Sequence, residues 1–268
     1  SACVAGPDYA PPATPEPQAY TRPADLEPAA PAAAGPWWTG FQTDGLNALI
    51  DAALAGNLDI RQGAERLAAA EALAGAARSD FFPTIDAGAD ATVRTQGGDT
   101  AGASLDLSQV IDVNGRLRRA QERARAQVLA AEFELEDIRR LTAASAASLY
   151  VETRRARARL ALLDASLELQ QRTLDIVERR AEAGLSADLD VRRAAADLAR
   201  TRAQRGALEL QQTRARNALS VLLGRVPGQA LPFLDPNGDA PADALGLSWD
   251  GAVALGAPAD MIRRRPDL

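Results

Sequence analysis

The stretch that decides the fold is RLRRAQERARAQVLAAEFELEDIRRLTAASAASLY, residues 116–150, with its continuation to residue 183. Between Gly115 and Gly184 the chain has neither glycine nor proline, the two residues that most often end a helix. Ala, Leu, Arg, Glu and Gln, all strong helix formers, fill it instead. The stretch therefore predicts a single helix roughly 100 Å long. Because such a helix cannot bury itself in one compact core, it must lie along other helices.

Apolar residues recur every seven positions along this helix. The two series are Leu117, Ala124, Ala131 and Ile138, then Leu160, Leu167 and Leu174. After a tight turn at Gly184-Leu185-Ser186, a second helix is expected to run back to Leu222. Its apolar stripe comprises Leu189, Ala196, Ala199, Leu208, Ala215, Leu219 and Leu222. Since a seven-residue repeat keeps one seam facing a partner helix, these patterns predict a long antiparallel helical hairpin.

Composition excludes several classes of function. The 268 residues carry a net charge of −6, no His and one Cys. An acidic chain lacks the basic surface of general nucleic-acid binding, so Arg154, Arg155, Arg157 and Arg159 are interpreted as a solvated face with interhelical ion pairs. The absence of His and the single Cys argue against a zinc site, a disulfide framework and a His-based triad. No run of eighteen apolar residues is present, so membrane insertion would need strands or a lipid anchor.

The chain opens with Ser1-Ala2-Cys3-Val4, which places its single Cys behind small residues. This order resembles the end of a bacterial lipoprotein signal, whose cleavage exposes the Cys for acylation; a stray terminal thiol is the alternative. A Pro/Ala-rich run over 11–36 follows and predicts an extended tether. The aromatic residues Trp37, Trp38 and Phe41 end it, and we expect them to pack the tether onto the body of the protein.

Two short helices and a hairpin come next. A helix from Asp44 is predicted to end at Gly56, and Asn57 is expected to cap a second helix reaching about Arg78. Strict alternation then covers two stretches of about ten residues on either side of Gln96-Gly97-Gly98-Asp99, which predicts a β-hairpin. The strand length suits a tilted bilayer crossing, and a hairpin in a soluble sheet is the alternative. The polar face carries Asp86, Asp90 and Asp106.

The order of these parts resembles the outer-membrane efflux channels of Gram-negative bacteria, in the acylated lipoprotein branch of the TolC-like proteins. The resemblance rests on Cys3 with Pro7-Asp8-Tyr9, on Ala183-Gly184-Leu185-Ser186-Ala187-Asp188, and on Arg263-Arg264-Arg265-Pro266-Asp267-Leu268. It implies a passive export conduit, not an enzyme, located in the outer membrane, held there by lipid and extending into the periplasm. It also implies a homotrimer when full length, a periplasmic adaptor and an inner-membrane pump as partners, and no cofactor beyond a covalent lipid on Cys3.

The same resemblance assigns roles to residues. Gly184, Leu185 and Ser186 would form the tip that docks on the adaptor, and Asp190 would help to gate the tunnel mouth. Asp86, Asp90 and Asp106 would face the lumen. Independently of the family, Ser186 or Asp188 is expected to cap the return helix, with the carboxylates of Asp188 and Asp190 near its positive end.

The predicted fold class is mainly α with a small β part. It combines a long antiparallel α-helical hairpin, an element of the tunnel, with one transmembrane β-hairpin, as one repeat of a normally two-repeat TolC-like fold. The predicted domains are the acylated N-terminus and tether at 1–36, short helices at 37–82, the transmembrane β-hairpin at 83–111, the helical hairpin at 112–223 and a connection toward a missing second repeat at 224–268.

Because one repeat supplies only half of the family's strands and tunnel helices, we expect the chain to be a fragment of a longer protein. A truncated, non-conducting family member is the alternative. A periplasmic lipoprotein adaptor with a coiled-coil hairpin is a further one, although adaptors carry β-rich domains beside their hairpin. Nothing in the sequence supports an enzyme, since it has no nucleophile–base pair, metal cluster or phosphate loop.

Overall fold

The computed structural model describes residue 6 and residues 36–229, 231–234, 247, 249, 262 and 265–267. The chain divides into two compact units. The first comprises Ser1–Pro17, Arg61–Asp137 and Ile262–Leu268, and the second comprises Gln18–Ile60 and Ile138–Met261. Helices α2 (Leu58–Ser79) and α3 (Arg116–Glu182) each contribute residues to both units. Most of the predicted N-terminal domain at 1–36 and much of the predicted connection at 224–268 lie outside the described residues.

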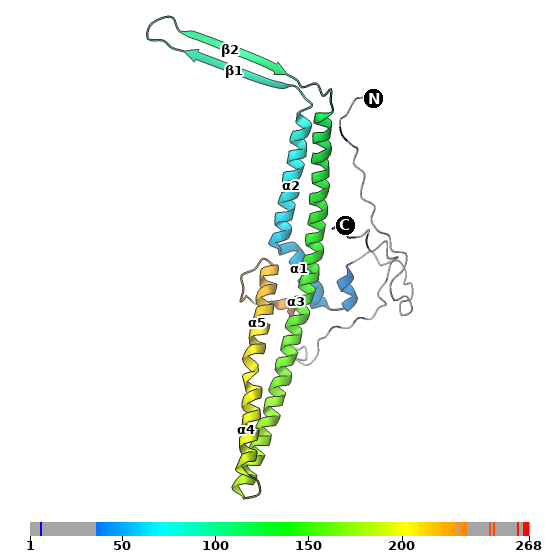
Figure 1. Ribbon diagram of the computed structural model, residues 1–268, viewed down its shortest axis with the longest axis vertical. Coiled ribbons are helices and arrows are strands. Elements are labelled where there is room, and N and C mark those ends of the chain that lie inside the picture. The colour runs from blue at the N-terminus through cyan, green and yellow to red at the C-terminus, as the bar shows by residue number, and fades with distance from the viewer. Residues whose placement is uncertain are drawn as a thin grey trace. The chain divides into compact units, whose positions relative to one another are not determined.

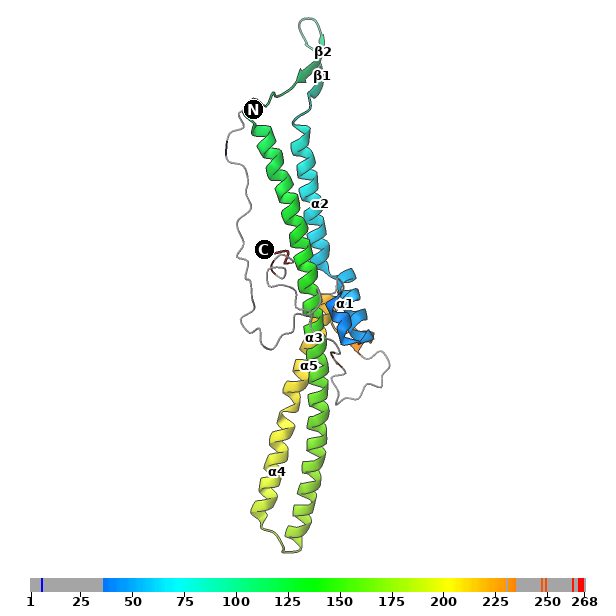
Figure 2. The same ribbon diagram turned by 90° about the vertical axis from the view of Figure 1, so that its right-hand side faces the viewer.

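In the first unit, α2 and the beginning of α3 run side by side, as Figures 1 and 2 both show. Arg66 Nη1 of α2 lies 2.7 Å from Glu134 Oε1 of α3 and forms an exposed ion pair across this contact. On α3 the predicted seam is confirmed in part: Leu117, Ala124 and Leu174 are buried, and the other predicted seam positions, Ala131, Ile138, Leu160 and Leu167, are half-buried. Strands β1 (Thr84–Thr92) and β2 (Thr100–Ser108) form the predicted antiparallel hairpin.

The segment Asp112-Val113-Asn114-Gly115 leads directly into the long helix, which begins at Arg116. Gly115 is buried with φ 75°, a conformation that favours glycine. Asp112 Oδ2 accepts a hydrogen bond from the N–H of Arg118 at 3.1 Å. Desolvation acts to raise the pKa of Asp112, but the N–H groups of Arg118, Leu117 and Arg116, with the charge of Arg118, outweigh it and lower that pKa below 3.8. The carboxylate thus stabilises the positive end of α3.

The second unit holds the main core, where α1 (Asp44–Gly56) packs on α3 and on α5 (Arg205–Leu222). Its fully buried large side chains come from all three helices, among them Leu49, Ile50, Tyr150 and Leu219. The short 3₁₀ helix Pro232–Leu234 adds Leu234 to the same core. Gly45 permits this packing, since a Cβ there would lie 2.5 Å from the carbonyl oxygen of Phe233. We call the end of the helical hairpin that carries this core, with Ala143–Tyr150 of α3 and Leu219–Leu223 at the end of α5, the equatorial end.

A backbone joint closes the equatorial end. Asn57 Oδ1 accepts hydrogen bonds from the N–H groups of Asp59 and Ile60 at 2.9 and 3.0 Å, which confirms the predicted cap of α2. Its Nδ2 also donates to the carbonyl of Leu222 at 2.9 Å. Beside it a Cβ on Gly224 would lie 2.3 Å from the carbonyl oxygen of Gly56. The backbone at the end of α1 therefore lies directly against the backbone that follows α5, and the Asn57 side chain joins the start of α2 to the same place.

Two of the three aromatic residues after the tether pack on the core as expected, and Trp37 is 45% exposed. Trp37–Phe41 forms a 3₁₀ helix, in which Trp38 and Phe41 lie against the core. The Phe41 ring meets Trp249 edge-on at 5.1 Å between centroids. Gly40 makes room for this contact, because a Cβ there would lie 2.5 Å from the Trp249 ring. These rings bring together segments that are about two hundred residues apart in the chain.

The return arm differs from the prediction in two ways. It is divided at Gln204 into α4 (Asp188–Ala203) and α5, where a single helix was expected. Its predicted stripe is also wrong in the first half, because Leu189, Ala196 and Ala199 are exposed and Leu198 is buried. The physical reason is the alanine content of α4, since small apolar residues there fit more than one seven-residue series. Farther on, Ala215 and Leu219 are buried as predicted.

Candidate functional site

The turn that joins α3 to α4 is held entirely by backbone hydrogen bonds. The N–H of Leu185 donates to the carbonyl of Arg180 at 2.7 Å, and that of Gly184 donates to Ala181 at 2.9 Å. This is the Schellman pattern, which needs a left-handed residue at the position of Gly184, whose φ is 72°. The predicted role of Gly184 in ending the helix is therefore confirmed.

The start of α4 corrects the predicted cap. Ala187, with φ −77° and ψ 146°, occupies the N-cap position and no side chain caps the helix there. Ser186 lies one residue too early and Asp188 already belongs to the first turn, so neither reaches the free N–H groups in the expected way. Asp188 and Asp190 do lie in that turn, as predicted, where their charges suit the helix dipole.

Exposure is what distinguishes the tip. The side chain of Leu185 is 71% exposed and that of Leu189 is 55% exposed, whereas Ser186 is half-buried. Asp188 pairs with Arg192 at 2.7 Å, and Asp190 Oδ1 lies 4.0 Å from Arg193 Nη1. The result is an apolar tip beside paired charges, a surface able to bind an apolar partner. Its proposed partner and the gating role of Asp190 remain predictions.

The β-hairpin separates residue types by face. Residues that pair across the strands are apolar on one face and polar or glycine on the other. On the apolar face Ile85 lies opposite Leu107 and Ala89 opposite Ala103. On the polar side Asp86 lies directly opposite Asp106, and Asp90 lies opposite Gly102. All eighteen strand residues are exposed. The predicted shared face of the three carboxylates is thus confirmed, and their orientation toward a lumen stays a prediction.

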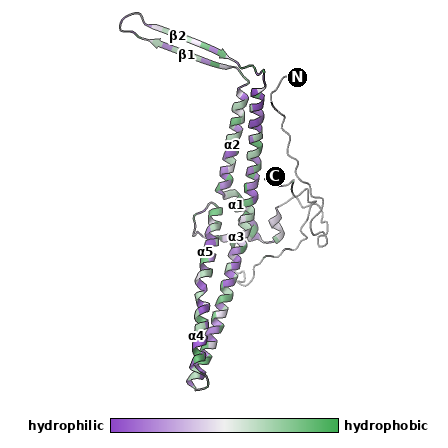
Figure 3. Ribbon diagram, in the orientation of Figure 1, coloured by the Kyte–Doolittle hydropathy of each residue, from purple (hydrophilic) through white to green (hydrophobic). Residues whose placement is uncertain are grey.

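The facing carboxylates have an energetic consequence. Like charges directly opposite each other in a sheet are destabilising, and an isolated two-stranded hairpin is at best marginally stable in water. The hairpin is therefore not a self-sufficient soluble element, and it requires further strands or another environment for its apolar face. Figure 3 shows hydrophobic and hydrophilic residues interspersed along the helices, and no helix among the described residues is long and apolar enough to cross a membrane.

Cys3, the predicted site of lipid attachment, lies outside the described residues. Gly6 is described, and its carbonyl accepts a hydrogen bond from Arg119 Nη2 of α3 at 3.1 Å. Within the described part of the chain no group of acidic or sulfur residues could hold a metal ion. Of the four arginines interpreted as a solvated face, Arg155 and Arg159 are exposed, whereas Arg154 and Arg157 are half-buried, and Arg154 Nη1 lies 3.5 Å from the carbonyl oxygen of Leu234.

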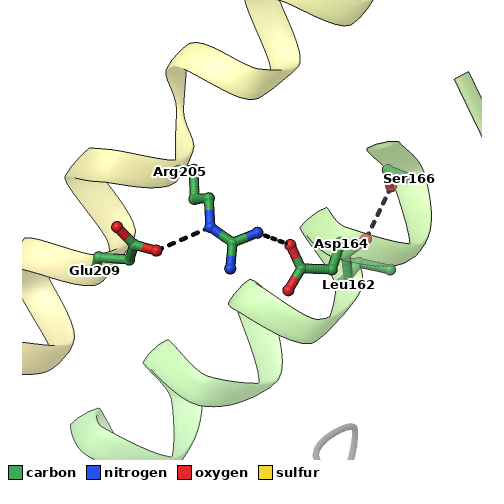
Figure 4. A network of polar contacts seen from close by, with 5 residues as sticks. All are labelled: Leu162, Asp164, Ser166, Arg205 and Glu209. Carbon is green, nitrogen blue, oxygen red and sulfur yellow. Dashed lines mark hydrogen bonds and ion pairs between the residues drawn. The ribbon is translucent and has the colours of Figure 1, made fainter. Parts of the chain in front are cut away.

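Sequence reasoning missed one polar cluster. Arg205, at the start of α5, pairs with Asp164 of α3 and with Glu209 at 2.8 Å (Figure 4). The hydrogen bond to Glu209 and the charge of Asp164 raise the pKa of Arg205. A sequence signal for this cluster exists: Arg205 lies seven residues after Leu198 and fourteen before Leu219, so a charged residue falls in a series whose ends are apolar.

Comparison with known proteins assigns the family. The model of the family described as "Outer membrane efflux protein" matches residues 49–225. The chain belongs to the outer membrane efflux protein family. This assignment confirms the resemblance at the level of the family and favours it over the periplasmic adaptor, and the acylated branch stays a prediction.

Among members of the family, Nodulation protein T of Rhizobium leguminosarum bv. trifolii is 29% identical over 282 residues, which cover 100% of this chain and 58% of that protein. The solvent efflux pump outer membrane protein SrpC of Pseudomonas putida is 30% identical over 240 residues, covering 85% of this chain and 49% of that one. The chain thus spans about half the length of the curated relatives it matches.

The structure leads to the same family. The outer-membrane channel OprN superposes with a TM-score of 0.78 at 31% identity, covering 99% of this chain and 60% of OprN. The predicted fold class is confirmed by this match, which includes the helical hairpin and the β-hairpin.

Proposed function

We propose that this chain is part of an outer-membrane channel subunit that serves as a passive export conduit in a tripartite efflux or secretion system. The observation that carries the proposal is the β-hairpin, with nine residues in each strand, one apolar face and one polar face, both exposed. Strands of about 9–11 residues cross a bilayer at a tilt, with apolar residues toward lipid and polar residues toward water. Lumen-facing Asp86, Asp90 and Asp106 would give the pore an acidic lining.

Exposed apolar stripes on the helical hairpin support assembly. On α3 the side chains of Leu162, Leu169 and Ile176 are 69%, 65% and 54% exposed and are seven residues apart. On the return arm Leu189 and Leu210 are 55% and 48% exposed and belong to another seven-residue series. Because the buried seam between the two arms uses other positions, these stripes are available to further helices. They support a homotrimer of the complete protein, with a coiled-coil tunnel in the periplasm.

The tip and the N-terminus complete the proposal. Leu185, with its neighbours Gly184 and Ser186, would dock on a periplasmic adaptor that leads to an inner-membrane pump, and Asp190 would contribute to the gate. Acyl chains on Cys3 would anchor the protein in the outer membrane of a Gram-negative bacterium, and more than one chain would be needed for firm attachment. The conduit makes and breaks no bond, since the pump supplies the energy and selects the small molecules exported.

The test places the same charge on each face of the hairpin in the complete protein. Ala89→Arg lies on the apolar face and Ser104→Arg on the polar face of the same strand pair. An Arg on the lipid side costs about 2–4 kcal/mol near the midplane, so Ala89→Arg is expected to abolish outer-membrane assembly while Ser104→Arg is tolerated. Membrane fractionation and native gels would measure this. Equal insertion of both variants would contradict a membrane-crossing hairpin.

A second variant separates docking from assembly. Leu185→Asp is expected to leave trimers intact and to abolish export, because it places a charge in an apolar contact, whereas Leu185→Met retains that contact. Export in the Leu185→Asp strain at the level of the Leu185→Met strain would remove the docking role of the tip.

A further inference from the structure

The return arm of the helical hairpin is interrupted at one residue. Gln204, with φ −73° and ψ −20°, separates α4 from α5. Its N–H donates to the carbonyl of Thr201, three residues back, at 3.1 Å, while the N–H of Leu208 reaches the carbonyl of Gln204 only at 3.4 Å. A short 3₁₀-type step inside a helix often marks a hinge.

Sequence and surroundings both weaken the helix at this step. Gly206, two residues later, is a poor helix former and the sole glycine between Ser186 and Leu222. A Cβ at Gly206 would meet nothing within 4 Å, so no close contact requires a glycine there. Gly206 therefore makes the backbone more flexible at this position, although packing does not require a glycine there.

Arg205 adds a contact between the arms at the same place. The inward positions of the return arm follow steps of three and four residues, which include Val191, Ala194, Leu198, Thr201, Leu208, Gln212, Ala215 and Leu219. Arg205 occupies the position between Thr201 and Leu208 in this series, and its guanidinium reaches Asp164 of α3 (Figure 4). Its side chain is exposed, so the ion pair links the two arms at the edge of the seam.

Packing differs on the two sides of Gln204. On the equatorial side, Ala215, Leu219 and Ser220 of α5 are buried. On the tip side, Leu198 is the residue of α4 that is buried. Between α4 and α3 lies a hollow of about 450 Å³ with a polar lining, formed by Gln170, Thr173, Ala194, Asp197, Arg200 and Thr201. Residues 205–214 of α5, next to the break, include no buried residue either, so α5 is held in place by its equatorial end, where Ala215, Leu219 and Ser220 are buried.

We propose that Gln204–Gly206 is a hinge on which α4 swings away from α3 while α5 stays in place, and that the Arg205–Asp164 ion pair is its latch. A swing of about 10° over the sixteen residues of α4 would move the tip by roughly 4 Å. The latch is exposed, with side-chain exposures of 44% for Arg205 and 47% for Asp164. Such a pair is weak and sensitive to salt, as a reversible latch requires. The hinge would operate whether or not the complete protein exports small molecules.

Spin-label distances on the whole chain test this hinge. In a Cys3→Ser background, labels at exposed Leu169 and Ala195 report on α3 and α4, and labels at exposed Arg159 and Thr213 report on α3 and α5. Arg205→Gln and Asp164→Asn are each expected to broaden the α3–α4 distance distribution and to leave the α3–α5 distribution unchanged. High salt should act on the wild type in the same way.

The control is Arg172→Gln, which breaks an exposed ion pair to Glu168 within α3 and should change neither distribution. Unchanged α3–α4 distances in both latch variants would overturn the proposal. Equal broadening of both label pairs would also overturn it, because the ion pair would then hold the whole hairpin and not a hinge.

Amide hydrogen exchange gives a second test, which uses other variants and so does not require the two latch variants to fold. Gly206→Ala should slow exchange at residues 204–208 about fivefold, because it strengthens the helix where the hinge needs it weak. The matched control is Gly75→Ala in α2, where a Cβ also meets nothing within 4 Å and exchange at 204–208 should not change. Wild-type amides at 204–208 that exchange as slowly as those of α5 would contradict a hinge.

Discussion

Both arms of the helical hairpin end in the same backbone turn, but the two turns have opposite surroundings. At the tip, Gly184 has φ 72° and the N–H of Leu185 donates to Arg180. At the equatorial end, Gly224 has φ 66° and the N–H of Arg225 donates to Ser220 at 2.8 Å. A Cβ on Gly184 would meet nothing within 4 Å, whereas on Gly224 it would overlap the carbonyl oxygen of Gly56.

The difference shows that one local motif serves two purposes. A glycine after the last helical turn ends a helix wherever it occurs. Whether that end is a joint or an exposed contact surface depends on what packs against it. The equatorial turn is fixed between α1, α2 and α5, and the tip turn presents Leu185 to solvent. Stability should therefore be concentrated at the equatorial end and recognition at the tip.

The largest expected effect compares one substitution at the two ends. Leu219→Ala removes a fully buried side chain from the equatorial core and should lower the free energy of unfolding by about 3–5 kcal/mol. Leu198→Ala, in the sparsely packed half, should cost about 2 kcal/mol, at the low end of the range for a buried Leu, because more of its surroundings can relax or hydrate. Urea unfolding followed by circular dichroism measures both. Equal losses would remove the proposed difference in packing.

The second prediction uses the two matched glycines. Gly184→Ala should cost about 1–2 kcal/mol, the strain of a left-handed alanine alone. Gly224→Ala carries the same strain and adds the overlap with Gly56, so its cost should exceed that of Gly184→Ala by about 1–3 kcal/mol. Thermal and urea unfolding of the two variants check the order. If Gly184→Ala were the more destabilising variant, the backbone around Gly56 and Gly224 would have to move apart without loss of stability, which contradicts tight packing there.

The third prediction divides the two roles of Asn57. Asn57→Ala loses both the cap of α2 and the bond to Leu222, and should destabilise by about 2 kcal/mol. Asn57→Ser keeps a capping oxygen and loses only the bond to α5, so about 1 kcal/mol is expected. If Asn57→Ser were as harmful as Asn57→Ala, the joint and not the cap would dominate. Equilibrium unfolding decides between them.

The smallest expected effect is the pH dependence of the Asp112 contact at the start of α3, which belongs neither to the tip nor to the equatorial end. The folded-state pKa of Asp112 lies below its ordinary value of 3.8, so its carboxylate adds stability that is fully present above that pH. The contribution is lost as pH falls through the folded-state pKa. Asp112→Asn should therefore make hydrogen exchange of the Arg118 amide insensitive to pH below about 4, after correction for the intrinsic rate. A wild-type chain with the same corrected profile would contradict the cap.

Local signals made much of the fold predictable. The stretch without glycine or proline predicted α3, alternation predicted β1 and β2, and Asn57 was correctly placed as a cap because its side chain acts on residues only two and three positions away. The tip turn was predicted for the same reason, since a left-handed glycine satisfies carbonyls of the helix just before it. The cap of α4 was wrong, because Ser186 and Asp188 are both plausible from composition and only the backbone geometry selected Ala187.

Contacts between distant residues could not be predicted in this way. The seam of α4 was misplaced because alanines fit two series equally well, and only packing on α3 selects Leu198 over Ala196. The Arg205–Asp164 pair joins residues 41 positions apart, at a separation where no spacing rule applies. Gly224 reads as a helix end in the sequence, and only the folded chain brings Gly56 against it.

The sequence by itself thus determined the helices, the strands and the turns between them, because propensity, periodicity and capping act within a few residues. Tertiary structure decided which faces of those elements meet. It packed the equatorial turn against Gly56, left the tip exposed, and brought Arg205 to Asp164 across the two arms. The physical reason is that close packing and ion pairing depend on the shape and position of both partners, and a single segment carries only one of them.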